Sequence, residues 1–253
     1  MVNTAGRAGS PAVHRATRIL GELAMHDEPL NVSELSRRVQ VPKSSLSDIC
    51  KVLVDGGMLS RGLDGGLRLG PGITRIARGL VGGSRLLEVF PRICAGAREL
   101  DGRTVVLAVL RDLDAAYVAV RPGDRPLSLT LKPGMRLPAW STGTGRALLS
   151  ALPVDVVERM HSGPVPESPS GHRFRLKDLT AAVTLAQSRG YASSAELGEM
   201  SLTGTAALVE GLHGCIAAVG SIADGTRSDE PSPADDSVPI RALAARLATA
   251  IRD

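Results

Sequence analysis

Aromatic residues are scarce in this chain of 253 residues, which contains one Trp, two Tyr and two Phe. The 43% of hydrophobic residues must therefore pack mainly through Leu, Val, Ile and Ala. Only three cysteines are present (Cys50, Cys94 and Cys215), and none has the C-x-x-C spacing of a zinc or redox site, so we expect buried thiols in a reducing cytoplasm. No apolar run approaches about 18 residues and no signal peptide is evident, so neither a membrane span nor export is expected.

The residues of an active site are also scarce. The five histidines are scattered, and none lies near a Cys or Ser in a recognisable nucleophile turn. Glu196 and Glu199 lie close together but have no partner for acid/base chemistry. Gly143 and Gly145 lack the spacing and the preceding strand of a dinucleotide or P-loop site. We therefore expect a protein that is not an enzyme, with no cofactor and no metal site.

The net positive charge is confined to the N-terminal third. Residues 1–80 carry eleven Lys and Arg against seven Asp and Glu, whereas residues 81–253 carry nineteen of each. All of the formal net charge of +4 therefore falls on the first third of the chain. Neutralisation of phosphate groups favours such a distribution in a nucleic-acid-binding segment. The excess is modest, so it supports a motif without establishing one.

Residues 32–70 have the pattern of a winged helix-turn-helix. Residues 32–39 form a short amphipathic helix, Gln40-Val41-Pro42 a turn, and residues 43–54 a second helix that ends at Gly56-Gly57. Leu46, Ile49, Cys50 and Leu53 share one face of this second helix, and short polar or charged side chains share the other. A helix that lies in a major groove needs these two faces.

The flanking segments complete this unit. Residues 11–26 carry apolar side chains at helical spacing and predict a first helix that covers the back of the other two. Leu63-Asp64-Gly65, between two short extended runs, is typical of a hairpin and predicts the wing. Side chains with the charge or the short polar groups to contact DNA are Arg15, Ser33, Lys43, Ser44, Ser45, Ser47, Asp48, Lys51, Arg61 and Arg68. Helix capping is the alternative role for Ser33 and Ser44.

Four segments are expected along the chain. Residues 1–10 form a disordered lead-in, residues 11–71 the DNA-binding domain, residues 72–101 a helical linker with a Gly82-Gly83 hinge, and residues 102–253 a second domain. The linker contains short amphipathic helices, one of them from Leu86 to about Leu100, with Pro91 inside it. Their apolar stripes are also suited to pairing with a second copy.

The second domain is predicted to be α+β, built round an antiparallel sheet. Strand-like runs are predicted at residues 105–110, 116–120, 127–131, 205–209 and 215–222. Helices are predicted at residues 143–152, 154–161 and 176–189, and a last one carries Ile240, Leu243, Ala244, Leu247 and Ile251 on one face. Loops rich in Pro, Ser and Asp are predicted at 162–171 and 223–236.

Taken in order, these features resemble the isocitrate-lyase-regulator (IclR) type of bacterial transcription factor. The motifs that carry the resemblance are Pro42-Lys43-Ser44-Ser45, Leu67-Arg68-Leu69-Gly70, residues 141–149 and residues 189–196. The resemblance covers nearly the whole chain from about residue 11. It implies an N-terminal winged helix-turn-helix, a helical linker and a C-terminal effector domain with a GAF/profilin-like fold. It also implies a homodimer or homotetramer that binds a small organic molecule.

The chain departs from the family at Asp48, where members usually carry an Arg. Asp48 can accept a hydrogen bond from a cytosine amino group, or it can pair with Lys43, Lys51 or Arg15. We favour a structural or neutral role, because an acid that faces DNA is repelled by phosphates.

The predicted effector site lies where the second domain opens a helix at Ser141–Thr144. Hydroxyl groups and free amides of Ser141, Thr142, Gly143 and Thr144 suit a carboxylate or carbonyl oxygen, and a simple N-cap without a ligand is the alternative. Leu127, Leu129, Met135 and Leu137 are expected as apolar walls, and Trp140 as the pocket floor or part of the core. The resemblance adds Ser194, Gly204, Gly220 and Ile222 where relatives have more polar ligand contacts, and Leu208 where they have Pro. This lower polarity argues against a glyoxylate- or pyruvate-like effector.

The sequence thus predicts a cytoplasmic transcriptional regulator, a repressor more readily than an activator. Its partners are double-stranded DNA with a pseudo-palindromic operator and a small organic effector, for which a carboxylate is one candidate; no membrane partner is expected. The alternative is a ligand-sensing interaction module whose winged helix contacts protein.

Overall fold

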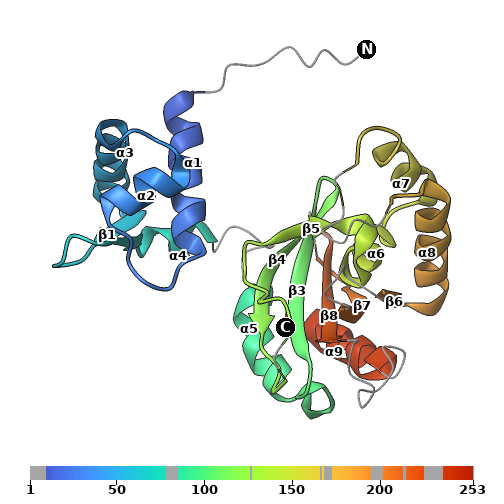
Figure 1. The fold of residues 1–253 in the computed structure, drawn as a ribbon. Helices are drawn as coiled ribbons and strands as arrows, with labels where there is room; N and C mark the ends of the chain where they lie inside the picture. Colours follow the sequence, from blue (N-terminus) through green and yellow to red (C-terminus); the bar gives the residue numbers. More distant parts are fainter. Residues whose placement is uncertain are drawn as a thin grey trace. The chain divides into compact units, whose positions relative to one another are not determined.

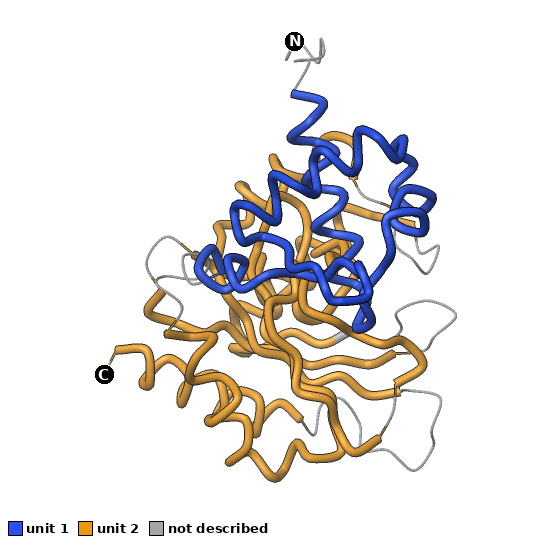
Figure 2. The backbone as a smooth tube through the Cα atoms, turned by 90° about the vertical axis from the view of Figure 1, so that its left-hand side faces the viewer, with its two compact units in different colours: residues 1–80 blue, residues 81–253 orange. Residues whose placement is uncertain are grey.

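The computed structural model of the chain divides into two compact units, residues 1–80 and residues 81–253 (Figure 2). The structure describes residues 10–77, 85–125, 127–165, 167, 173–194, 202–212, 215–224 and 236–252. Residues 1–9 of the predicted lead-in and the predicted Gly82-Gly83 hinge lie outside these ranges. No helix in the described ranges is long and apolar enough to cross a membrane.

The first unit has the predicted order of three helices and a hairpin, followed by one short helix (Figure 1). Its elements are α1 (Pro11–Ala24), α2 (Val32–Val39), α3 (Lys43–Asp55), β1 (Leu59–Arg61), β2 (Leu67–Leu69) and α4 (Gly72–Ala77). β1 and β2 are antiparallel, and Leu59 pairs with Leu69. The predicted winged helix-turn-helix is therefore confirmed.

The turn between α2 and α3 is fixed by local hydrogen bonds. Gln40 adopts a left-handed conformation with φ 50° and ends α2. The Ser36 hydroxyl then donates to the Val41 carbonyl at 2.6 Å, and the Val41 amide donates to the Ser36 carbonyl at 3.1 Å. The turn takes three residues, and α3 begins after Pro42.

The helix caps differ from those that the sequence suggested. The N-cap of α2 is Asn31, whose side-chain oxygen accepts from the Glu34 amide at 2.9 Å, and the N-cap position of α3 is occupied by Pro42. The capping roles considered for Ser33 and Ser44 are therefore wrong, because each is the second residue of its helix. An Asn accepts from the amide three residues ahead as readily as a Ser does.

A small aliphatic core holds the first unit together. Ile19, Leu35, Leu46 and Cys50 are each 0% exposed and join α1, α2 and α3. The wing joins this core through Leu67, which exchanges two backbone hydrogen bonds with Leu30 at 2.8 and 3.0 Å. Gly70 ends the wing where a Cβ atom would lie 2.4 Å from the Gly57 carbonyl oxygen, so only glycine fits there.

The second unit is built on one six-stranded sheet in which every pair is antiparallel, as predicted for an α+β domain. The strand order is β5-β4-β3-β8-β7-β6. The strands are β3 (Thr104–Arg111), β4 (Asp114–Arg121), β5 (Arg136–Pro138), β6 (Ala192–Ser194), β7 (Leu202–Val209) and β8 (Ala217–Asp224). The helices are α5 (Arg85–Ala95), η1 (Arg98–Leu100), η2 (Ala139–Ser141), α6 (Gly143–Leu149), α7 (Val154–Met160), α8 (Leu176–Arg189) and α9 (Ser237–Ala250).

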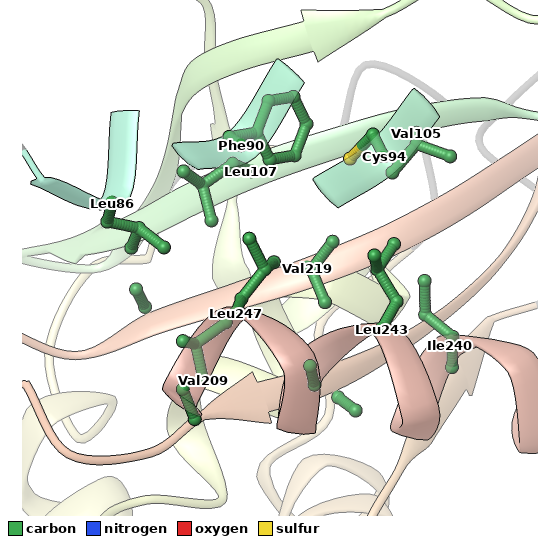
Figure 3. Packing of buried hydrophobic residues seen from close by; sticks show 14 of the residues in the cluster. Leu86, Phe90, Cys94, Val105, Leu107, Val209, Val219, Ile240, Leu243 and Leu247 are labelled. Carbon is green, nitrogen blue, oxygen red and sulfur yellow. The ribbon is translucent and has the colours of Figure 1, made fainter. Parts of the chain in front are cut away.

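The two faces of the sheet carry different layers. Val105, Leu107 and Val109 of β3 pack with α5 and α9, and the close-up in Figure 3 shows Phe90 of α5 and Leu243 of α9 among this cluster. The alternate residues, among them Val106 and Ala108, pack on the opposite face with α6. This alternation explains why the strands read as nearly continuous apolar runs: both faces are covered.

A buried ion pair fixes the start of α9. The Arg103 Nε atom lies 3.1 Å from an Asp236 carboxylate oxygen, and the Ser221 hydroxyl donates to the same oxygen at 2.8 Å. Arg103 and Asp236 side chains are only 7% and 11% exposed. The interaction connects the beginning of β3, the middle of β8 and the residue before α9.

Two expectations need correction. Residues 127–131 form no strand, although Leu131 is buried and Leu127 and Leu129 are half-buried. Side chains alternate between buried and exposed wherever an extended segment lies over a core. Residues 127–131 do so here without pairing with a neighbouring strand of the sheet. The chain also divides inside the predicted linker 72–101: α4 belongs to the first unit, and α5 buries Leu86 and Phe90 in the core of the second.

Candidate nucleic-acid interface and ligand site

The exposed face of α3 is polar and rests on a rigid core. Lys43, Ser44, Ser47, Asp48 and Lys51 are exposed, and Ser45 is half-buried. Leu46 and Cys50 on the opposite side are 0% exposed and fix the helix to α1 and α2. Burial raises the pKa of the Cys50 thiol, which keeps it neutral in the core. The two faces predicted for this helix are therefore present.

The wing carries Arg61 on β1 and Arg68 on β2, and both side chains are exposed. The Arg61 guanidinium donates to the Gly65 carbonyl at 3.5 Å, and the Asp64 carboxylate accepts from the Gly66 amide at 3.1 Å. These bonds shape the tip, where Leu63 is fully exposed. The wing thus carries two cations on a short, tightly turned hairpin.

Not every cation of the unit is free for an anion. The Arg38 guanidinium donates to one Glu34 carboxylate oxygen through two nitrogens, at 3.1 and 2.8 Å, and lies 2.8 Å from the His26 Nε2 atom. Arg38 lowers the pKa of Glu34 through this hydrogen bond and its charge. Arg38 therefore joins α2 to the end of α1.

The other predicted contacts are more dispersed. Arg15 is half-buried on α1, and Ser33 is exposed on α2, so neither lies on α3 or the wing. The structure adds Val52, which the sequence analysis did not select and which is 70% exposed on α3. Its position four residues after Asp48, away from the apolar stripe, is the signal that places it on the exposed side.

The predicted effector site at the start of α6 is buried and internally bonded. Thr142 is 1% exposed, and its hydroxyl oxygen accepts from the Gly145 amide at 2.8 Å, so the N-cap alternative describes this residue. The Ser141 hydroxyl donates to the Pro138 carbonyl at 2.9 Å. A Cβ atom on Gly145 would lie 2.2 Å from the Ala139 carbonyl oxygen, so this glycine permits close packing.

A buried tyrosine adjoins this segment. The Tyr117 side chain on β4 is 1% exposed, and within the described residues its hydroxyl makes no hydrogen bond of regular geometry. Burial raises the pKa of Tyr117 to about 12, and the hydroxyls of Thr144 and Thr142 partly oppose that rise. The sequence analysis missed Tyr117. The feature that could have indicated it is a single phenol within a run of apolar residues predicted to form a strand.

The sheet brings several predicted effector residues onto the same face. Ile222 pairs with Gly204 and Gly220 pairs with Ala206, and a Cβ atom on Gly220 would lie 2.8 Å from the Thr144 hydroxyl oxygen. Ser194 of β6 pairs with Gly204. Leu137 and the half-buried Met135 join the cluster on this face.

A hollow of about 180 Å³ lies on this face beside β3 and β4. It is lined by Leu127, Leu129 and Leu131, together with Thr104, Val120 and Arg125 among others. Two of the predicted wall residues therefore border an open space. Two larger hollows, of about 470 and 310 Å³, run along α9. Of the positions considered for the effector site, only Leu208 lines one of them, the hollow of about 310 Å³.

Trp140 belongs to a separate cluster. Its ring meets Phe174 edge-on with centroids 5.4 Å apart, and it packs with Leu149, Val157 and Leu179. Of its two expected roles, the core role is the one that the structure has. Among the described residues, no group of three His, Cys, Asp or Glu side chains is placed to hold a metal ion.

Comparison with known proteins finds relatives of this chain by sequence and by structure. A MarR family model matches residues 11–66. The chain is 38% identical over 148 residues to HTH-type transcriptional regulator Rv1719 of Mycobacterium tuberculosis and 31% identical over 156 residues to HTH-type transcriptional regulator TtgV of Pseudomonas putida. These matches cover 57% and 60% of this chain and 56% and 59% of the relatives' lengths, so each spans little more than half of either protein.

Solved structures extend the likeness to nearly the full length. An IclR homolog of Microbacterium hydrocarbonoxydans, complexed with 4-hydroxybenzoate, has a TM-score of 0.76 at 24% identity and covers 95% of this chain and 99% of its own. The repressor BlcR of Agobacterium tumefaciens has a TM-score of 0.59 at 28% identity and covers 95% and 96%. The IclR of Thermotoga maritima has a TM-score of 0.69 at 17% identity and covers 94% and 97%.

Proposed function

This chain has the fold of the IclR-type transcriptional regulators, and on that premise we propose that it binds operator DNA under the control of a small organic effector. The observation that carries the proposal is the first unit: a polar, exposed face of α3 and two wing arginines, all held by one aliphatic core. We further propose that the protein is a repressor that effector binding releases from DNA.

In the proposed complex, α3 lies in the major groove. Its first turn places Lys43 and Ser44 toward phosphates, while Ser47 and Asp48 reach base edges. Arg61 and Arg68 of the wing contact phosphates or the adjacent minor groove. The helix supplies recognition and the wing supplies affinity.

A pseudo-palindromic operator follows from pairing of two chains. Val13 on α1 and Ile76 on α4 are 64% and 62% exposed, and we propose that they contact a second copy of this unit. Two paired units present two copies of α3, and half-sites then repeat with about one turn of the duplex. A change in that spacing weakens binding to both half-sites together.

The proposed effector site is the face of the sheet that carries Tyr117, Thr144 and Gly220, together with the hollow beside Leu127 and Leu129. A buried phenol that makes no hydrogen bond of regular geometry to the described residues favours a ligand that supplies one. The hollow of about 180 Å³ is small for a ligand pocket and suits a small molecule. Leucine walls with Arg125 at the border favour an apolar carboxylate, and an IclR homolog is known with 4-hydroxybenzoate.

The experiment is a mobility-shift assay on DNA upstream of the protein's own coding region, with and without small aromatic carboxylates. We expect a specific shift at low salt that persists over unrelated competitor DNA, and its loss when 4-hydroxybenzoate or a related acid occupies the second unit. If no nearby promoter is shifted at low salt, the regulator proposal fails. Capture of a protein partner by the first unit instead favours the interaction-module alternative.

A further inference from the structure

Asp48 occupies the centre of the exposed face of α3. At about 3.6 residues per turn, Ser44 lies one turn before it and Val52 one turn after it, and Leu46 and Cys50 face the opposite way into the core. Asp48 itself is exposed, and Val52 is 70% exposed. A duplex that docks on this face meets Asp48 at the middle of the contact.

The carboxylate has no cation to neutralise it in the described part of the chain. Lys43, Lys51 and Arg15 were the expected partners, and none of them forms an ion pair with Asp48. The sequence favoured a structural or neutral role, and the structural role has no ion pair in the described residues to support it. Both carboxylate oxygens are available to accept hydrogen bonds from outside the unit.

The chemistry of a major groove leaves few partners for such a group. A carboxylate only accepts, so it is repelled by guanine, which presents acceptors N7 and O6, and by the O4 acceptor of thymine. Donors are the N4 amino group of cytosine and the N6 amino group of adenine. Adenine places its N7 acceptor beside that donor, where the second carboxylate oxygen is repelled, and cytosine places only a C–H there.

We propose that Asp48 is a specificity-determining residue that accepts a hydrogen bond from a cytosine N4 amino group at one position of each half-site. The inference rests on the proposed DNA binding and deepens it. Repulsion between Asp48 and the phosphates lowers affinity for every sequence, and the cytosine contact offsets this cost only at the correct base. Asp48 therefore acts by attraction to one base and by rejection of others.

The test is selection of binding sites from a randomised duplex library by wild type, Asp48→Asn and Asp48→Ala. Wild type is expected to select cytosine at one position in each half-site, and replacing that base is expected to weaken binding by about 5-fold or more. Asp48→Ala is expected to lose the preference at that position alone. Asp48→Asn is expected to select adenine there, because an amide donates to N7 and accepts from N6.

Asp55→Asn is the matched control, since it removes an exposed acid at the end of the same helix. It is expected to leave the selected sequence unchanged. Circular dichroism melting of each variant checks that the first unit remains folded, as an exposed position should allow. Unchanged base preference in Asp48→Ala would overturn the inference while leaving DNA binding intact. Failure of the wild type to select any DNA would overturn both the inference and the proposed function.

Discussion

At the scale of single residues, the chemistry of the second unit centres on groups that the sequence could not evaluate. Ser141, Thr142 and Thr144 were selected because hydroxyls and amides at a helix start suit an anion. The Ser141 hydroxyl instead donates to the Pro138 carbonyl and the Thr142 hydroxyl accepts from the Gly145 amide, and composition does not reveal that these groups are used within the chain. Tyr117 was overlooked because its importance lies in burial of the hydroxyl without a regular hydrogen bond to any described residue, which is a property of the fold.

Replacing Tyr117 with Phe tests that description. We expect the free energy of unfolding at pH 7 to stay equal or to rise by up to about 1 kcal/mol, because the change removes a buried hydroxyl that lacks a hydrogen bond. Urea denaturation measures this value, with Tyr191→Phe at a half-buried position as the control. A loss of more than about 1 kcal/mol would mean that the hydroxyl is well bonded.

The same variant has a distinct pH dependence. The pKa of Tyr117 rises from 10.0 to about 12 on folding, so above pH 10 the unfolded chain loses this proton before the folded chain does. Wild type should therefore lose stability between about pH 10 and pH 12, and Tyr117→Phe should lose less over that window. Equal slopes in both proteins would contradict a buried, neutral phenol.

At the scale of elements, the sequence predicted helices and strands best where the signal for the element lies within the segment itself. α2, the turn, α3 and the hairpin were all predicted, because helical periodicity and an Asp-Gly step are local signals. Residues 127–131 were misread since burial alternates there without a pairing strand. The sequence also could not predict what α5 packs against, because its apolar stripe suits a sheet and a second copy of the chain equally well.

The start of α2 offers a direct test of the corrected cap. Asn31→Ala should lower the stability of the first unit by about 1 kcal/mol, because the Glu34 amide loses its acceptor. Ser33→Ala, inside the same helix, should change stability by less than about 0.5 kcal/mol. Thermal melting followed by circular dichroism measures both, and a larger loss for Ser33→Ala would restore the original capping assignment.

At the scale of the whole molecule, the net charge differs between the same two parts of the chain that form the two compact units. The net positive charge falls on residues 1–80, which form one compact unit, and the balanced remainder forms the other. The sequence analysis placed a linker at residues 72–101, and the boundary between the two units falls inside that range. Which residues of the second unit meet an effector could not be predicted in this way, since that face joins β3 and β4 to β7 and β8, two pairs of strands that lie far apart in the chain.

The central claim is that the exposed face of α3 binds duplex DNA, and the salt dependence of binding tests it most directly. Fluorescence anisotropy gives the slope of log affinity against log salt for wild type, Lys43→Ala with Lys51→Ala, and the control Lys177→Ala on α8. Loss of two phosphate contacts should weaken binding and reduce the steepness of the slope by about 2, and Lys177→Ala should match wild type. An unchanged slope in the double variant would show that α3 does not face the phosphates and would contradict the account.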